Sequence, residues 1–216
     1  MHDDRRLIER RIRRALDERI RPAVYAEFAP VDVAAWQVDG EPVPVSEALA
    51  AGYAPFEVGQ RWGPPWGTTW FRFTGSVPRA WAGRTVELVL DLGFDQVSPG
   101  FQAEGLAYRA DGAPVKGINP FNAWIPVTDT DLTFYVEAAA NPVILDFRHP
   151  YRPTLLGDVE TAGREPLYRL AMAQLAVFDR EVWELVADLE VLDQLMHALS
   201  TDSARRWEIL RACDRA

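Results

Sequence analysis

The sequence predicts a mainly β protein: an antiparallel β-sandwich with an N-terminal helix and a C-terminal helical segment. In the middle of the chain, apolar and polar residues alternate in short runs that are separated by glycine- and proline-containing turns. Both ends carry apolar residues at helical spacing instead. We therefore expect three regions: residues 1–29, 30–160 and 161–216.

The first region, residues 1–29, is expected to hold a helix from about Asp3 to Arg21 and a lead-in to the sheet. Its apolar residues recur at every fourth position and form one stripe: Ile8, Ile12, Leu16 and Ile20. Pro22 should end the helix, because proline has no N–H to donate. Acidic residues interleave with the arginines, which favours a solvent-facing helix with i,i+4 pairs over an arm for nucleic acid or membranes.

Residues 30–160 are expected to form the sandwich itself, in a jelly-roll or galactose-binding-like arrangement. The run "RTVELVLDLGF" places four apolar residues on one face of a strand: Val86, Leu88, Leu90 and Leu92. Asp111-Gly112 stands between two short strand-like runs and is the strongest hairpin signal in the chain. A parallel sheet would need helical crossovers, and this region shows no helical pattern.

Residues 161–216 are predicted to be a helical connector. Pro166 suits the first turn of a helix. After it, apolar residues recur at spacings of three, four or five: Leu170, Leu175, Phe178, Val182, Leu185, Leu189, Leu192 and Met196. A further helix that contains Trp207 is still in its apolar pattern at Ala216, so we expect the natural protein to be longer.

Composition narrows the class of protein. The net charge of −9 gives no electrostatic footprint for nucleic acid. The single cysteine, Cys213, cannot form an internal disulfide and fits a reducing compartment. The sequence shows neither an 18-residue apolar run nor the apolar core of a secretory signal. We expect a cytoplasmic protein that binds neither nucleic acid nor membrane.

The residues that most often carry chemistry do not form a recognisable set. His2, His149 and His197 lie in a terminus, a loop and a helix, so they do not suggest a converging ligand set, and we expect no metal site in this chain. Acidic residues come in close pairs: Asp91 with Asp95, Asp129 with Asp131, and Asp158 with Glu160. Glycosidases use such pairs, but acids in an acidic sequence are more often turn residues, and we assign no catalytic residue.

Three tryptophans stand in the stretch "RWGPPWGTTWFRFTG". Trp70 falls inside an alternating strand and is expected in the core. Trp62 and Trp66 lie outside that strand, in a turn stiffened by Pro64 and Pro65. Rings in such a turn can stack on a sugar or contact a neighbouring domain.

If these rings stack on a sugar, Asn119, Asn122 or Asp95 from other loops would supply its hydrogen bonds. Residues 61–75 contain no acid or amide of their own. We therefore favour packing or a domain contact for Trp62 and Trp66, and the sugar site stays open as the alternative.

Three stretches together resemble the N-terminal region of the cytosolic-type glycoside hydrolase family 38 α-mannosidases. They are "FEVGQRWGPPWGTTWFRFTGSVPRAWAGRTVELVLDLG", "AYRADGAPVKGIN" and "AMAQLAVFDREVWELVADLEVLDQL", and they occur in the family's order. The resemblance extends from about Ala54 to the C-terminus, and the tryptophan-rich stretch is its most specific part.

The resemblance implies a non-catalytic N-terminal domain of an enzyme that hydrolyses terminal α-linked mannose in oligosaccharides. It implies a missing C-terminal catalytic domain as the partner, with a divalent metal (zinc or cobalt) held there through a His-x-Asp motif. No histidine of this chain is followed two residues later by aspartate, so neither the metal ligands nor the nucleophile transfers. The chain alone is expected to be inactive. A stand-alone carbohydrate-binding module and an oligomerisation domain that forms homo-oligomers remain the alternatives.

Overall fold

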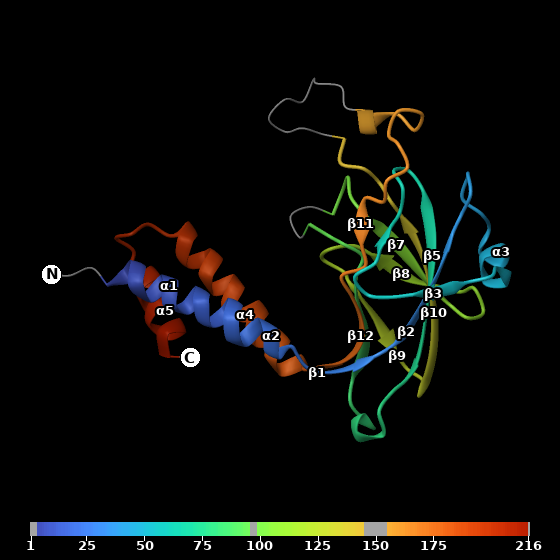
Figure 1. The fold of residues 1–216 in the computed structure, drawn as a ribbon. Coiled ribbons are helices and arrows are strands. Elements are labelled where there is room, and N and C mark those ends of the chain that lie inside the picture. The colour runs from blue at the N-terminus through green and yellow to red at the C-terminus, as the bar shows by residue number, and fades with distance from the viewer. Residues whose placement is uncertain (1–3, 96–98, 145–154, 216) are drawn as a thin grey trace. The chain divides into compact units, whose positions relative to one another are not determined.

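The computed structural model describes residues 4–95, 99–144 and 155–215, and the chain divides into two compact units. The larger unit is Phe28–Ala176. The smaller unit combines Met1–Glu27 with Val177–Ala216. Figure 1 shows layered strands in the larger unit and helices in the smaller one.

Two main sheets form the sandwich. The first has six strands in the order β3-β2-β5-β10-β7-β8. In chain order these are β2 (Asp32–Gln37), β3 (Ala54–Phe56), β5 (Thr68–Ser76), β7 (Glu104–Arg109), β8 (Pro114–Ile118) and β10 (Asp131–Ala139). The second sheet has the order β1-β12-β6-β9. It contains β1 (Tyr25–Pro30), β6 (Val86–Asp91), β9 (Trp124–Val127) and β12 (Met172–Phe178).

The predicted core face of β6 is confirmed. Val86, Leu88, Leu90 and Leu92 are all buried. Leu88 lies opposite Ile125 of the antiparallel strand β9, and both side chains are fully buried. Strict alternation specified this register, because a slip of one residue would have turned all four side chains to the other face.

Strand β5 is buried on both faces, which explains its density of aromatic residues. Phe71 and Phe73 share one face of the strand, and Phe73 lies opposite Phe134 of β10. Trp70 lies on the other face, stacked on Tyr108 at 5.3 Å between ring centroids. It belongs to a cluster of buried residues that includes Ala48 of the short helix α3 (Val45–Ala50). The prediction that Trp70 is a core residue is confirmed.

Helix α3 is the exception to the prediction of a region without helices. It stands between β2 and β3, which are antiparallel neighbours in the six-stranded sheet, so it is not a crossover of a parallel sheet. Short 3-10 turns also occur, at η2 (Arg79–Trp81) and η3 (Leu155–Gly157).

The hairpin predicted at Asp111-Gly112 joins β7 to β8. Gly112 has a φ of +84°, a conformation that glycine adopts without steric cost. The Asp111 carboxylate accepts the backbone N–H of Ala113 at 2.9 Å, which closes the turn.

The prediction of helix from Pro166 onward is wrong for its first part. Residues Tyr168–Arg169 form β11, which pairs with β4 (Arg61–Trp62), and β12 follows directly. In β12, Ala173, Leu175 and Val177 alternate toward the interior and are buried. The helix α4 (Arg180–Ala198) begins only after Asp179, whose carboxylate accepts the N–H of Val182 at 3.0 Å as an N-cap.

Helices make up most of the smaller unit. The N-terminal helix consists of α1 (Arg5–Ala15), the π turn η1 (Leu16–Ile20) and α2 (Arg21–Ala23), and it ends one residue after Pro22. Within η1 the N–H of Arg21 donates to the carbonyl of Leu16, five residues back. The other helices of this unit are α4 and α5 (Ala204–Arg215). No helix in the described parts of the chain is both long and apolar enough to span a membrane.

The predicted apolar stripe of the N-terminal helix packs within this unit. Leu16 and Ile20 contact Val186 and Leu189 of α4 in one cluster. Ile8 and Ile12 join a second cluster with Met196, Ile209 and Leu210. Ion pairs surround these clusters: Arg13 with Asp193, Arg21 with Glu190, and Arg206 with Glu9.

Candidate functional site

Trp62 lies in the interior of the larger unit and is only 3% exposed. Its indole N–H donates to the backbone carbonyl of Leu92 at 2.9 Å. The ring meets Phe71 edge to face at 5.4 Å between centroids and lies at the same distance from Tyr168. This ring is satisfied by protein contacts and offers little surface to an external partner.

Trp66 is 39% exposed. Its indole N–H donates to the carbonyl of Leu156 at 2.9 Å, and its backbone N–H donates to Ala140 at 3.0 Å. These two bonds hold the ring in one orientation while much of its surface stays in contact with solvent. Trp66 and Trp62 are thus in opposite environments although only three residues separate them.

The backbone of the turn explains how Trp66 is presented. Trp66 has a φ of +66°, which is an outlier for a bulky side chain. A conformation of this kind costs on the order of 1–3 kcal/mol and persists only where the surroundings impose it. Gly67 donates its N–H to Pro64 at 2.8 Å, and a Cβ at Gly67 would come within 2.8 Å of the Pro64 ring. Proline and glycine therefore fix a tight turn that projects the indole.

A groove of about 800 Å³ lies beside Trp66. Three chain segments line it: residues 37–42, residues 64–67, and residues 159–160 with 163–164. Hydrogen bonds hold each wall in place. Val38 donates its backbone N–H to Thr68 at 3.0 Å, and the Thr161 hydroxyl donates to the carbonyl of Leu155 at 2.7 Å. We call this site the Trp66 groove.

Charged side chains surround the indole in the Trp66 groove. Asp39, Glu41 and Glu160 are acidic and Arg164 is basic, and all four are exposed. Within the described part of the chain, none of them forms an ion pair. Their hydrogen-bonding groups therefore face the groove or water. The site combines an aromatic surface with carboxylate acceptors and guanidinium donors.

Asn119 and Asn122 do not line the Trp66 groove. They bridge one another in the turn after β8, where Asn122 donates its backbone N–H to Asn119 at 2.9 Å. The Asn119 side chain accepts the N–H of Phe121, and the Asn122 amide donates to Gly117 at 2.7 Å. These amides hold a turn that exposes the ring of Phe121. Asp95, a further predicted hydrogen-bonding residue, is engaged with Gln102 instead.

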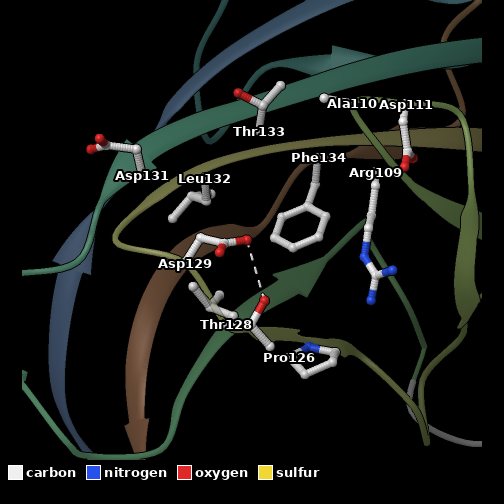
Figure 2. Close-up of a pocket in the computed structure, with 11 residues that line it drawn as sticks. Arg109, Ala110, Asp111, Pro126, Thr128, Asp129, Asp131, Leu132, Thr133 and Phe134 are labelled. Carbon is white, nitrogen blue, oxygen red and sulfur yellow. Dashed lines mark hydrogen bonds between the residues drawn. The ribbon is translucent and has the colours of Figure 1, made fainter.

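A second cavity, of about 350 Å³, lies where the β7–β8 hairpin approaches the β9–β10 turn. Figure 2 shows the ring of Phe134 between Asp129 and Arg109, with Asp129 bonded to Thr128. Asp131 accepts the hydroxyl of Ser76 at 2.5 Å. One cation and several turn carboxylates line this cavity, without a histidine, cysteine or second base among its lining residues.

The other acidic pairs serve backbone turns. Asp91 accepts the N–H groups of Gly93 and Phe94, and Asp158 accepts that of Glu160. His197 is exposed, with Nδ1 2.8 Å from the carbonyl of Asp193, one turn earlier in α4. His2 and His149 lie outside the described residues. Among the described residues, no three histidine, cysteine or acidic side chains stand close enough to hold a metal ion.

Burial shifts the pKa of several groups without activating any of them. Burial raises the pKa of the Cys213 thiol, helped by the nearby charge of Asp193, so less reactive thiolate forms. Burial also raises the pKa of Tyr168 to about 12, and its hydroxyl donates to the carbonyl of Asn141. Desolvation lowers the pKa of Lys116, against the opposing charge of Glu87, and its ammonium lies 3.1 Å from the centroid of the Trp124 ring.

The sequence did not point to the polar half of the Trp66 groove. Asp39, Glu41, Glu160 and Arg164 are distant from Trp66 in the chain and belong to no motif. The only local signal is turn composition around Gly40 and Gly163, both of which have positive φ. Turn composition predicts that a loop is present, but it does not predict which other loop of the fold lies beside it.

Comparison with known proteins gives a consistent result. The family described as "Alpha-mannosidase, jelly roll domain" matches residues 29–176. The chain is 31% identical over 203 residues to alpha-mannosidase 2C1 of Homo sapiens, which covers 90% of this chain and 18% of that protein. It is 29% identical over 183 residues to the Mus musculus protein of the same name, covering 81% of this chain and 16% of that protein.

Among solved structures, a β-glucuronidase from an uncultured Clostridium sp. aligns with a TM-score of 0.41 at 11% identity, over 71% of this chain and 29% of that one. The chain spans less than a fifth of the length of the two α-mannosidases. The family match covers nearly all of the β-sandwich, and both relatives carry the name predicted from the tryptophan-rich stretch. The chain therefore belongs to the family of α-mannosidase jelly roll domains.

Proposed function

We propose that this chain is the non-catalytic jelly roll domain of a longer α-mannosidase that hydrolyses terminal α-linked mannose. The observation that carries the proposal is the family match over residues 29–176, joined to the small share of the relatives that the chain spans. In this view the chemistry belongs to the remainder of the polypeptide.

The hydrogen bonds of the acidic residues support the proposal that this chain is non-catalytic. Asp91, Asp158 and Asp131 each accept turn or hydroxyl hydrogen bonds through one carboxylate oxygen. The described residues also lack a donor set for zinc or cobalt, the metal that the resemblance implies for the parent enzyme. We assign that metal and the nucleophile to the part of the enzyme outside this chain.

Surface features suggest where the remainder of the enzyme binds. The helix α4 exposes apolar side chains at every fourth position on its outer side, with Trp183, Val191 and Leu195 exposed and Ala187 half-buried. We call this row the α4 stripe. Apolar stripes of this kind commonly mark a protein contact, and we assign the α4 stripe to the catalytic region of the same polypeptide.

The predicted site residues then divide by role. We propose that Asn119 and Asn122 hold the turn that presents Phe121 to a neighbouring domain. Trp62 is proposed to anchor the Pro64-Pro65 turn to the interior of the sandwich, because its ring packs against Phe71 and Tyr168. Trp66 lines the Trp66 groove.

The proposed location is the cytoplasm, which agrees with a single unpaired cysteine. The division at residues 29 and 160 stays a prediction, which limited proteolysis followed by mass spectrometry tests. A homo-oligomer formed by this chain is the competing proposal, and light scattering of the purified chain measures it directly.

The decisive experiment compares the 216-residue chain with the longer enzyme on an aryl α-mannoside, with and without added zinc or cobalt. We expect turnover by the longer enzyme, lost on chelation, and none by the chain. Turnover by the chain that disappears in Asp91→Asn or Asp95→Asn would contradict the proposal. A longer protein without mannosidase activity whose chain forms discrete oligomers would favour the oligomerisation domain.

A further inference from the structure

The Trp66 groove has the size and composition of a small-ligand site. Its volume of about 800 Å³ falls within the range of ordinary ligand pockets. The aromatic surface comes from Trp66, and the polar groups come from the two other segments of its wall. Residues 61–75 contain no acid or amide of their own to hold a sugar's hydroxyls. The fold supplies these groups from elsewhere in the chain.

The indole of Trp66 is held in place while part of its ring surface stays exposed. Its N–H is already bonded to Leu156, so the ring does not need a ligand to satisfy its polar atom. What remains exposed is largely ring surface. A pyranose has an apolar face of C–H groups that packs well on such a surface, and the ring's fixed orientation reduces the entropy lost on binding.

The charged groups fit hydroxyls better than ions. Carboxylates of Asp39, Glu41 and Glu160 accept O–H donors in charge-assisted hydrogen bonds, and the Arg164 guanidinium donates to ring and hydroxyl oxygens. Three acids against one base give a net negative groove, which repels carboxylates and phosphates. A quaternary ammonium would prefer several aromatic rings, and Trp66 is the only aromatic residue among the described residues that line this groove.

We propose that the Trp66 groove binds a neutral, hydroxyl-rich pyranoside, with the sugar stacked on Trp66 and its hydroxyls bonded to Asp39, Glu41, Glu160 and Arg164. The groove chemistry does not depend on the proposed function. Only the choice of a mannoside as the first probe rests on it. Such a site would hold part of a glycan away from the bond that the enzyme cleaves.

The test titrates the 216-residue chain by saturation-transfer NMR. The probes are methyl α-D-mannopyranoside and methyl β-D-glucopyranoside, with D-glucuronate as an anion and choline as a cation. We expect saturable binding of a neutral glycoside with a Kd of about 1–10 mM. Glucuronate and choline should bind at least about tenfold more weakly.

The variants are chosen to keep the fold. Trp66→Gly removes the ring and suits the positive φ of that position, so it should fold as the parent does. It should weaken glycoside binding at least about tenfold, and Glu160→Gln should weaken it by about threefold or more. Trp183→Ala removes another exposed indole, on α4, and should leave binding within about twofold.

The proposal is wrong if no neutral glycoside saturates the chain up to about 50 mM, or if Trp66→Gly binds as the parent does. Tighter binding of glucuronate or choline would also overturn it. If Trp66→Gly instead destabilises only the longer enzyme, and the chain binds no sugar, the groove is a domain contact. Sugar binding by the chain and mannoside hydrolysis by the longer enzyme are measured separately. A negative result for the Trp66 groove therefore leaves the proposed mannosidase function untested, and the reverse also holds.

Discussion

At the scale of single residues, the tryptophan-rich turn places its rings in two environments that its composition does not distinguish. Trp62 and Trp66 flank the same pair of prolines, yet one ring is enclosed and the other is presented to solvent. The difference arises from β4, which pairs with β11 and draws Trp62 against Tyr168. The next residues leave the ribbon and turn outward through the positive φ of Trp66.

This separation predicts losses of stability that differ in size. Trp62→Ala should lower the free energy of unfolding by about 3–5 kcal/mol, because it empties a buried site and leaves the carbonyl of Leu92 without its donor. Trp66→Gly should cost about 1 kcal/mol or less, because the ring is exposed and glycine relieves the backbone strain. Urea denaturation followed by circular dichroism measures both. Equal losses would show that the two rings share one structural role.

Tyr168 should make the stability of the fold sensitive to alkaline pH. Its pKa is raised from 10.0 to about 12 in the folded state, so above pH 10 the unfolded chain loses this proton first. The contribution is therefore present below pH 10 and is lost as the pH rises toward 12. Burial also raises the pKa of Tyr53 and Tyr108, which contribute in the same direction.

We expect Tyr168→Phe to flatten this alkaline loss without removing it. Urea midpoints at about pH 9 and about pH 11 should differ less in the variant than in the parent, because one titrating group is gone. Phe28→Leu changes an exposed ring that carries no titratable hydroxyl, so it is the control and should leave the difference unchanged. An identical pH dependence in Tyr168→Phe would show that another group controls the alkaline limb.

At the scale of elements, strand β6 was predictable and strand β12 was not. The alternation of β6 admits only one period, and the hairpin at Asp111-Gly112 is equally specific. The apolar residues Leu170, Leu175 and Phe178 fit both a strand and a helix, because short apolar runs do not distinguish the two periods. Burial in the second sheet decided the conformation of β12, and it depends on strands far away in the sequence.

The register of β6 gives a direct test. Leu88→Ala and Leu90→Ala should each cost about 2–5 kcal/mol, because both side chains are fully buried. Val89→Ala, on the opposite face and only half-buried, should cost clearly less. Denaturant midpoints of the three variants decide the matter. A larger loss at Val89 than at its neighbours would place the wrong face of β6 in the core.

At the scale of the whole molecule, the fold and the family followed from the sequence, whereas the Trp66 groove did not. Periodicity reports on the environment of each element, and the tryptophan-rich stretch is specific enough to indicate the family. The groove depends on which loops meet. Asp39 and Arg164 come together with Trp66 only through the strand order of the sandwich, which no local pattern encodes.

The α4 stripe carries the last prediction, on assembly with the rest of the enzyme. Val191 is 62% exposed and Leu195 is also exposed, so replacing both with aspartate should change the stability of the 216-residue chain by about 0.5 kcal/mol or less per site. In the proposed longer α-mannosidase the same double variant should lower the melting temperature and the yield of active enzyme. Buried apolar anchors at interfaces commonly contribute more than about 2 kcal/mol, and a carboxylate there would be desolvated. Thr201→Asp adds one negative charge in the exposed turn after α4, where there is no apolar stripe, and should leave the longer enzyme unchanged. A double variant with a normal melting temperature and normal activity would show that the α4 stripe makes no contact with the catalytic region.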